Sequence, residues 1–150
     1  MSRPTHAARS GFTLVEVMIV VVVMAILAGA VLPQFTDTTK VTKTNNAKYN
    51  VQKLRSQLQL YKLQHGGQVP ARLENLTQRT DASGTVGTGA AFIYGPYMQA
   101  IPENGFTSSA KVSPANANPP TAASGAADAG WLYHAASGGV WIDDAELLAE

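Results

Sequence analysis

The stretch FTLVEVMIVVVVMAILAGAVL, residues 12–32, decides the fold of this chain, because its 21 residues hold a single charge, Glu16. As an α-helix it is about 32 Å long at ~1.5 Å per residue, which matches the hydrocarbon core of a bilayer. In lipid every backbone group must bond within the segment, and a helix satisfies this condition. The alternative is a buried core helix, but such a helix would show a polar face. The sequence therefore predicts a transmembrane helix.

The composition of the whole chain excludes several classes of protein. Its 150 residues allow one modest domain. The formal net charge is +1, whereas nucleic-acid-binding domains are usually strongly basic, so we expect no nucleic-acid partner. The chain has no cysteine, which excludes a disulfide scaffold, a thiolate metal site and a cysteine nucleophile.

The residues before the apolar stretch set its orientation. Residues 1–11 carry Arg3 and Arg9 and no acid, so the positive-inside rule leaves the N-terminus in the cytoplasm and places the residues after 32 outside it. Ordinary signal-peptide cleavage after the small residues 28–30 is a competing interpretation. Glu16 argues against it, because a carboxylate within an apolar helix costs about 2.5–3.5 kcal/mol and usually marks a function.

The hexapeptide GFTLVE, residues 11–16, followed at once by the apolar run, resembles the cleavage and methylation motif of type IV pilins and type II secretion pseudopilins. The resemblance covers Arg9 to about Phe106 and, more weakly, the predicted C-terminal hairpin, and it is strongest to the major pseudopilin. It implies that a prepilin peptidase removes the leader, residues 1–11, by cutting between Gly11 and Phe12. It also implies that Phe12 is then N-methylated and that Glu16 serves filament assembly. A type IV or minor pilin is the alternative; the lack of cysteine favours the pseudopilin, because many pilins have a C-terminal disulfide loop.

The same resemblance implies a structural filament subunit of a type II secretion system, which polymerises through its N-terminal helix to drive protein export. The implied partners are further copies in a homo-oligomeric filament, other pseudopilins or pilins, the prepilin peptidase, the inner-membrane assembly platform and membrane lipid. The implied location is the inner membrane, with a single pass and a periplasmic head, or an extracellular filament for the pilin alternative. A periplasmic binding domain on an uncleaved anchor is a different class, and it predicts no processing at Gly11.

The position of Glu16 suggests how it serves assembly. Cleavage creates an amine on Phe12, four residues or about one helical turn from Glu16. A carboxylate and an amine attract strongly at low dielectric, and each is costly there alone. We expect Glu16 of an incoming subunit to pair with the Phe12 amine of its neighbour and to set the axial register. The alternatives are that Glu16 reaches the headgroups or pairs with the amine of its own chain.

Beyond the apolar stretch, the pattern predicts an amphipathic helix over residues 33–65. Pro33 lies one turn after Gly29, which predicts a kink at Gly29–Pro33. One apolar stripe recurs at helical spacing, and we expect it to pack on a small head: Ala47, Val51, Leu54, Leu58 and Tyr61.

The opposite face of this helix is basic, with one acid, Asp37. Its basic residues are Lys40, Lys43, Lys48, Lys53, Arg55 and Lys62. This face is either solvated or pairs with the acidic C-terminal end of a neighbouring subunit, a contact that salt would weaken.

Residues 66–150 predict a small periplasmic head, so that the fold class is α+β: a long N-terminal helix, transmembrane in its first half and amphipathic in its second, packed on a head with a short antiparallel β-sheet. Residues 71–78 predict a short helix, and residues 107–112 a strand. Residues 131–134 and 140–142 flank a glycine-containing turn and predict a β-hairpin. Residues 113–130 are rich in small residues and proline, which predicts a disordered surface loop.

The sequence carries no enzyme signature, and we expect no catalytic residue. None of the three histidines has a metal-ligating neighbour at a useful spacing. The resemblance raises calcium as an alternative to the absence of a cofactor, because many major pseudopilins hold calcium with acidic residues and carbonyls of the C-terminal loop. The candidates are Asp128, Asp143 and Asp144, in a loop that does not match that pattern closely. Calcium needs six to eight oxygen ligands, so isolated aspartates are weak support.

Overall fold

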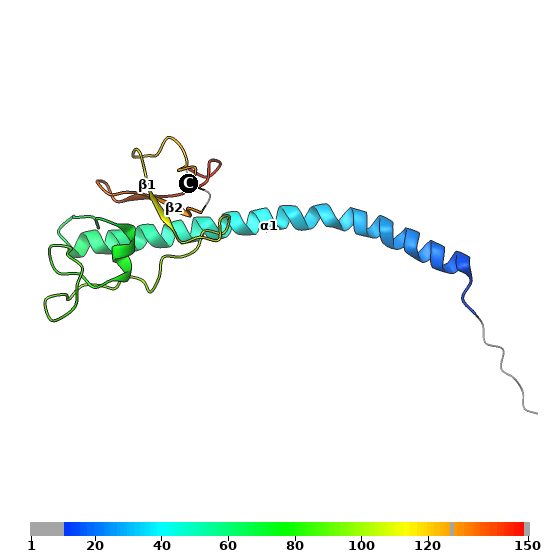
Figure 1. Cartoon of the computed structure of the whole chain (residues 1–150), viewed down its shortest axis with the longest axis horizontal. Coiled ribbons are helices and arrows are strands. Elements are labelled where there is room, and N and C mark those ends of the chain that lie inside the picture. Colours follow the sequence, from blue (N-terminus) through cyan, green and yellow to red (C-terminus); the bar gives the residue numbers. More distant parts are fainter. Residues whose placement is uncertain (1–10, 127, 149–150) are drawn as a thin grey trace, which may run out of the picture. The chain divides into compact units, whose positions relative to one another are not determined.

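The computed structural model describes residues 11–126 and 128–148, with the backbone alone over 31–37. The chain divides into two compact units, residues 1–40 and residues 41–150. Helix α1, Leu14–Gln64, runs through both and contains 51 residues (Figure 1). It remains helical through Pro33, so the predicted long helix over 12–65 is confirmed to within two residues at each end. The kink at Gly29–Pro33 stays a prediction.

Within its own unit, the described side chains of the first part of α1 are not buried by any other segment. All residues from 11 to 30 are exposed, including the apolar ones. Among the described residues, no helix combines the length and the apolarity needed to cross a membrane. The transmembrane first half of the helix therefore stays a prediction.

The second part of α1 carries the core of the head. The five residues of the predicted stripe, from Ala47 to Tyr61, are each no more than 2% exposed. They form one cluster with residues of the sheet and of the short helix, which confirms the amphipathic prediction. Helix α1 then ends at a glycine pair: Gly66 and Gly67 have φ of 61° and 89°, and the Gly67 N–H donates to the carbonyl of Lys62.

The predicted short helix at 71–78 forms as η1, Leu73–Thr77, a 3₁₀-helix rather than an α-helix. Five residues are too few for a stable α-helix, and a single 3₁₀ turn is enough to bury two side chains on one side. Leu73 and Leu76 are both fully buried in the cluster with the stripe of α1.

The sheet of the head has three strands in the order β1-β2-β3. β1 is Val112–Pro114, β2 is Trp131–His134 and β3 is Gly139–Ile142. β2 and β3 form the predicted antiparallel hairpin, with Trp131 opposite Ile142. Alternation along both strands turns one face toward α1, and its core residues are Trp131, Tyr133, Val140 and Ile142.

The prediction of a short antiparallel sheet is confirmed for β2 and β3 but was wrong for β1, which pairs with β2 in parallel, with Val112 opposite Trp131. The strand also lies at 112–114 instead of 107–112. Residues 105–108 form a turn, closed by the bridge between Asn104 and Ser109. The long segment after β1 makes the parallel return possible, since parallel neighbours need a connection of a dozen or more residues.

This connection is shorter than the predicted loop, because Ser113 and Pro114 belong to β1. Its described part makes defined hydrogen bonds. The Ala115 N–H donates to the carbonyl of Tyr133 at 2.9 Å, and the Asn116 side chain donates to Thr121 at 3.1 Å. The predicted disorder of this segment stays a prediction.

Candidate functional site

The first turn of α1 is built around Glu16. The Glu16 Oε2 atom accepts the Thr13 N–H and the Thr13 hydroxyl, each at 2.8 Å. In return, the Glu16 N–H donates to Thr13 Oγ1 at 3.3 Å. This reciprocal pair is a capping box, which satisfies donors that the start of a helix otherwise leaves unpaired.

The capping box adds a role for Glu16 that sequence reasoning missed. The signal was present in the sequence, since Thr13 and Glu16 have the Ser/Thr-x-x-Glu spacing of that motif. Both bonds from Thr13 end on Oε2, and Oε1 accepts no hydrogen bond within the part of the chain that the structure describes. The carboxylate is thus oriented by its own helix while one of its oxygen atoms faces outward.

The expected cleavage site lies directly before this turn. Gly11 and Phe12 precede the helix, and Phe12 is 88% exposed. Exposed backbone outside a helix or sheet is the form of chain that proteases cut most readily. The rest of the leader, residues 1–10, lies outside the described residues.

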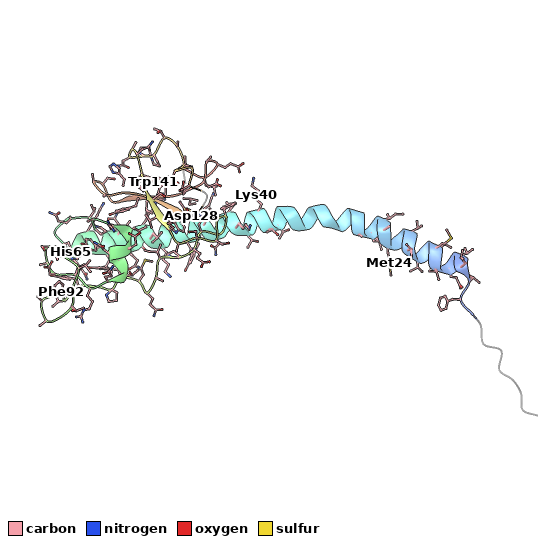
Figure 2. The ribbon with its side chains drawn as sticks, viewed as in Figure 1. Met24, Lys40, His65, Phe92, Asp128 and Trp141 are labelled. Atoms are coloured by element: carbon pink, nitrogen blue, oxygen red, sulfur yellow. The ribbon has the colours of Figure 1, made fainter. Side chains whose placement is uncertain are left out.

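The apolar surface after Glu16 surrounds the helix instead of forming a stripe. Large side chains from Leu14 to Leu27 are 48–76% exposed, and Figure 2 shows Met24 projecting away from α1. A helix that is apolar on all sides is typical of one whose surroundings are also apolar. Large exposed apolar surfaces mark sites of association with proteins or membranes.

Two residues of the basic face are bound within the head. Arg55 donates from Nε and Nη2 to the carbonyl of Val140, at 3.3 and 3.1 Å. Lys62 Nζ donates to the carbonyl of Ser137 at 3.1 Å. These bonds tie α1 to the β2–β3 hairpin, so the face is less available to solvent or to other subunits than its sequence suggested.

The end of α1 holds a buried histidine. The His65 ring stacks on Tyr61 at 3.9 Å, with an angle of 11° between the ring planes (Figure 2 labels His65). His65 Nδ1 lies 2.9 Å from the Tyr61 carbonyl, and Nε2 lies 3.0 Å from both Thr80 Oγ1 and the Asp81 carbonyl. Nδ1 is thus bound within the end of the helix, while Nε2 joins the helix end to the loop after η1.

The titratable groups around His65 have structural roles too. Hydrogen bonds from Ser83, above all from its hydroxyl, hold the pKa of Asp81 below its ordinary value. Burial raises the pKa of Tyr61. The cluster thus joins the end of α1 to the loop after η1.

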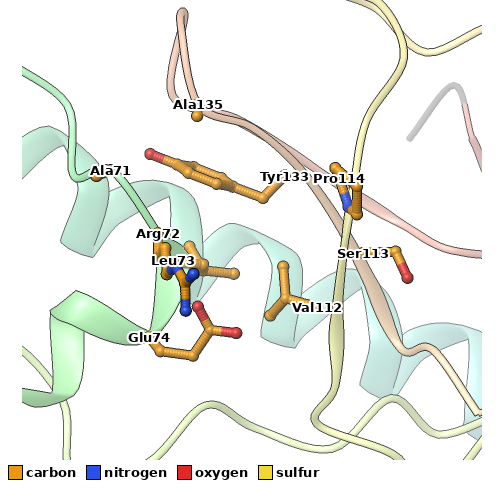
Figure 3. Close-up of a pocket in the computed structure, with 9 residues that line it drawn as sticks. All are labelled: Ala71, Arg72, Leu73, Glu74, Val112, Ser113, Pro114, Tyr133 and Ala135. Carbon is orange, nitrogen blue, oxygen red and sulfur yellow. The ribbon is translucent and has the colours of Figure 1, made fainter.

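A pocket of about 340 Å³ lies between η1 and β1 (Figure 3). Arg72 and Glu74 contribute its charged side chains, and Tyr133 forms one wall. The Tyr133 hydroxyl donates to the carbonyl of Pro70 at 2.6 Å, so it is occupied within the fold. Ser113 lines the pocket beside β1, and Glu74 lines it on the side of η1.

Each of the three calcium candidates binds a partner within the chain. Asp128 pairs with Lys111 at 2.6 Å, Asp143 binds Ser124, and Asp144 Oδ1 accepts the Glu146 N–H at 2.9 Å. Within residues 11–126 and 128–148, no three side chains of the metal-ligating kinds gather into a group.

Two protein families match the chain. The family described as the prokaryotic N-terminal methylation motif matches residues 6–32, the segment that includes Gly11, Phe12 and Glu16. The family described as type II secretion system protein G matches residues 34–128, more than half of the chain. The chain belongs to the type II secretion system protein G family. This membership confirms the predicted resemblance to the type II secretion pseudopilins, and the protein G family is structural rather than catalytic.

Two relatives of known identity extend this result. The chain is 42% identical over 55 residues to the type II secretion system core protein G of Pseudomonas aeruginosa, over 37% of this chain and 39% of that protein. It is 34% identical over 76 residues to the competence protein ComGC of Halalkalibacterium halodurans, over 51% of this chain and 72% of that protein. The match thus spans well under half of the Pseudomonas protein. No solved structure matches this chain.

Proposed function

We propose that this protein G family member is the major pseudopilin of a type II secretion system. In this proposal, it polymerises through the apolar first part of α1 into a filament that drives protein export. The observation that carries the proposal is the exposure of the whole apolar surface between Leu14 and Leu27, which lies within the segment that matches the methylation-motif family. Within the described chain this surface has no partner of its own, and a filament of copies or a bilayer would supply one.

Residues 12–32 anchor the subunit in the inner membrane with a single pass before assembly, and the head lies in the periplasm. The support for this topology is the sequence: the stretch has one charge, and the residues before it carry Arg3 and Arg9 and no acid. The partners that follow are membrane lipid, the prepilin peptidase that cuts between Gly11 and Phe12, the assembly platform of the inner membrane and the other pseudopilins.

Glu16 links membrane insertion to assembly. Its Oε2 atom is held by Thr13, while Oε1 is left for the Phe12 amine of a neighbouring subunit. An unpaired carboxylate in a bilayer is costly, and its pairing with an amine removes much of that cost. The free energy of a subunit in the filament would thus be lower than that of a subunit alone in the membrane.

The test is the N-terminus of the protein purified from cells with and without the prepilin peptidase. Mass spectrometry should find N-methyl-Phe12 as the first residue when the peptidase is present, and sheared filaments should contain this form. A protein that keeps residues 1–11 and still supports export would overturn the proposal. Gly11→Leu, which blocks the cut without altering the mature chain, is the matched control.

A second candidate is a type IV or minor pilin of a surface filament. The similarity to ComGC favours it, because the match covers 72% of that competence protein. Deletion of the gene separates the two: the pseudopilin proposal expects exported proteins to accumulate in the periplasm, whereas the alternative expects export to continue.

A further inference from the structure

The segment between β1 and β2 closes onto the sheet through side chains that the family resemblance would assign to calcium. We infer that this chain replaces the calcium with two side-chain clasps, Asp143–Ser124 and Lys111–Asp128, and that its head folds independently of calcium. The inference concerns the stability of the head and does not depend on the proposed filament function.

The first clasp uses both oxygens of one buried carboxylate. Asp143 follows β3 directly and is 8% exposed. Its Oδ1 accepts the Ser124 N–H at 2.7 Å, and its Oδ2 accepts the Ser124 hydroxyl. The Asp143 N–H in turn donates to the carbonyl of Gly130 at 3.1 Å. A carboxylate with both oxygens bound in this way has its charge satisfied by the protein.

The second clasp supplies a positive charge from the chain itself. Lys111 Nζ lies 2.6 Å from Asp128 Oδ2, and this hydrogen bond holds the pKa of Asp128 below its ordinary value. The Lys111 carbonyl accepts the N–H groups of Gly130 and Trp131, which fixes the lysine at the start of β2. The Lys111 ammonium group therefore balances the negative charge of Asp128 in the loop.

The backbone of Gly130 is bonded to a residue of each clasp, because its N–H donates to the Lys111 carbonyl and its own carbonyl accepts the Asp143 N–H. A Cβ at this position would collide with the carbonyl oxygen of Ser109, and it would also crowd the Asn104 side chain. Asn104 donates to the Gly130 carbonyl at 2.8 Å, which pins the end of the loop from a third side. The loop thus has a complete set of protein partners where it rejoins the sheet.

The residues present do not fit calcium. That ion takes six to eight oxygen ligands that converge on one point, from carboxylates, carbonyls and water. Here Asp128 is directed to Lys111, Asp143 to Ser124, and Asp144 to the N–H of Glu146. The described residues contain no group of three metal-ligating side chains. A cation next to Asp128 would also be repelled by the lysine ammonium.

The test is thermal unfolding of the full chain in detergent, with calcium chloride, with magnesium chloride and with EGTA. We expect the same melting temperature in all three, and titration calorimetry should detect no heat of calcium binding. Ser124→Ala should lower the melting temperature by about 4 °C, equally with calcium and with EGTA, because it removes one bond of a buried carboxylate.

The matched pair for the carboxylate is Asp143→Asn and Asp144→Asn, which make the same chemical change at neighbouring positions. Asp143→Asn should destabilise the head, because its amide nitrogen would face Ser124. Asp144→Asn keeps an oxygen for Glu146 and should have little effect. A melting temperature of the unaltered chain that rises with calcium and falls with EGTA would overturn the inference, and so would a Ser124→Ala variant as stable as the parent. The calcium dependence of the melting temperature of the unaltered chain tests the inference even where a variant fails to fold.

Discussion

Two stretches of α1 use their apolar side chains in opposite ways. Between residues 47 and 61, five apolar residues form one stripe that packs in the head, and each of their side chains is no more than 2% exposed. Between residues 14 and 27, the large apolar side chains are 48–76% exposed on all sides of the helix. A single apolar stripe needs one partner surface, and the head of this chain supplies it. A helix that is apolar on all sides, as between residues 14 and 27, needs an apolar environment around it.

The largest effect is expected in the exposed stretch. Glu16→Ala should reduce the recovery of sheared filaments by about 100-fold or more, because the Phe12 amine of the neighbour would lose its buried counter-charge. Cleavage after Gly11 should persist, as judged by mass spectrometry. Thr13→Val is the control, since it removes the capping hydroxyl and keeps the carboxylate, and it should reduce assembly less. Normal incorporation of the Glu16→Ala subunit would contradict the pairing hypothesis.

In the buried stripe, Leu54→Ala should lower the free energy of unfolding by about 2–5 kcal/mol, because it leaves a cavity in the core. Leu63→Ala makes the same change on the same helix at a residue that is 80% exposed, and its effect should stay within about 0.5 kcal/mol. Denaturant unfolding followed by circular dichroism measures both. Equal effects would show that α1 does not pack on the head as described.

The loop before β1 should be sensitive to Asn104→Ala, with a loss of about 1–3 kcal/mol. The Asn104 side chain is fully buried, donates to Gly130 and accepts the Phe106 N–H at 2.8 Å. Its removal leaves the Phe106 N–H without this partner and takes away one of the two hydrogen bonds to the Gly130 carbonyl, which also accepts the Asp143 N–H. The exposed Asn45 of α1 is the control for an asparagine-to-alanine change, and its replacement should be close to neutral. A neutral Asn104→Ala would contradict the described turn.

Tyr133→Phe should cost about 0.5–1.5 kcal/mol at neutral pH, because it removes the hydrogen bond to Pro70. Burial raises the pKa of Tyr133 above its unfolded value of about 10. Its neutral form is therefore the one that the fold stabilises, and this contribution is present below about pH 10 and is lost as the pH rises further. The cost of the substitution should shrink in alkaline solution, which unfolding curves at a series of pH values measure. A cost in unfolding free energy that does not change with pH would contradict the burial of the Tyr133 side chain.

The smallest effect concerns the basic face. Lys53→Glu should weaken filament formation by a factor of about five or less and reduce its salt dependence, as expected of an exposed charge pair between subunits. Arg55→Glu differs, because Arg55 also binds the Val140 carbonyl within the head, so its replacement should lower the melting temperature of the subunit as well. Filaments that respond neither to salt nor to Lys53→Glu would exclude charge pairing at this face.

The sequence predicted those features that depend on local periodicity. The helical spacing from Ala47 to Tyr61 gave the buried stripe, and the alternation along 131–134 and 140–142 gave the hairpin and its inward face. The roles of single side chains were harder to predict. The Thr13–Glu16 capping box was visible in the sequence but was overlooked, whereas the bonds from Arg55 and Lys62 to hairpin carbonyls join residues 85 and 75 positions apart.

Residues that are close together in the chain account for the long α1, for the apolar stretch with its one acid, and for the family to which the chain belongs. The tertiary structure alone decided that β1 runs parallel to β2, and that Asp128 and Asp143 each find a partner within the chain. The physical reason is that strand order and charge pairing depend on where a long, small-residue connection returns to the sheet. No local pattern encodes that return, which is fixed by the packing of Trp131 and Gly130 against residues far away in the sequence.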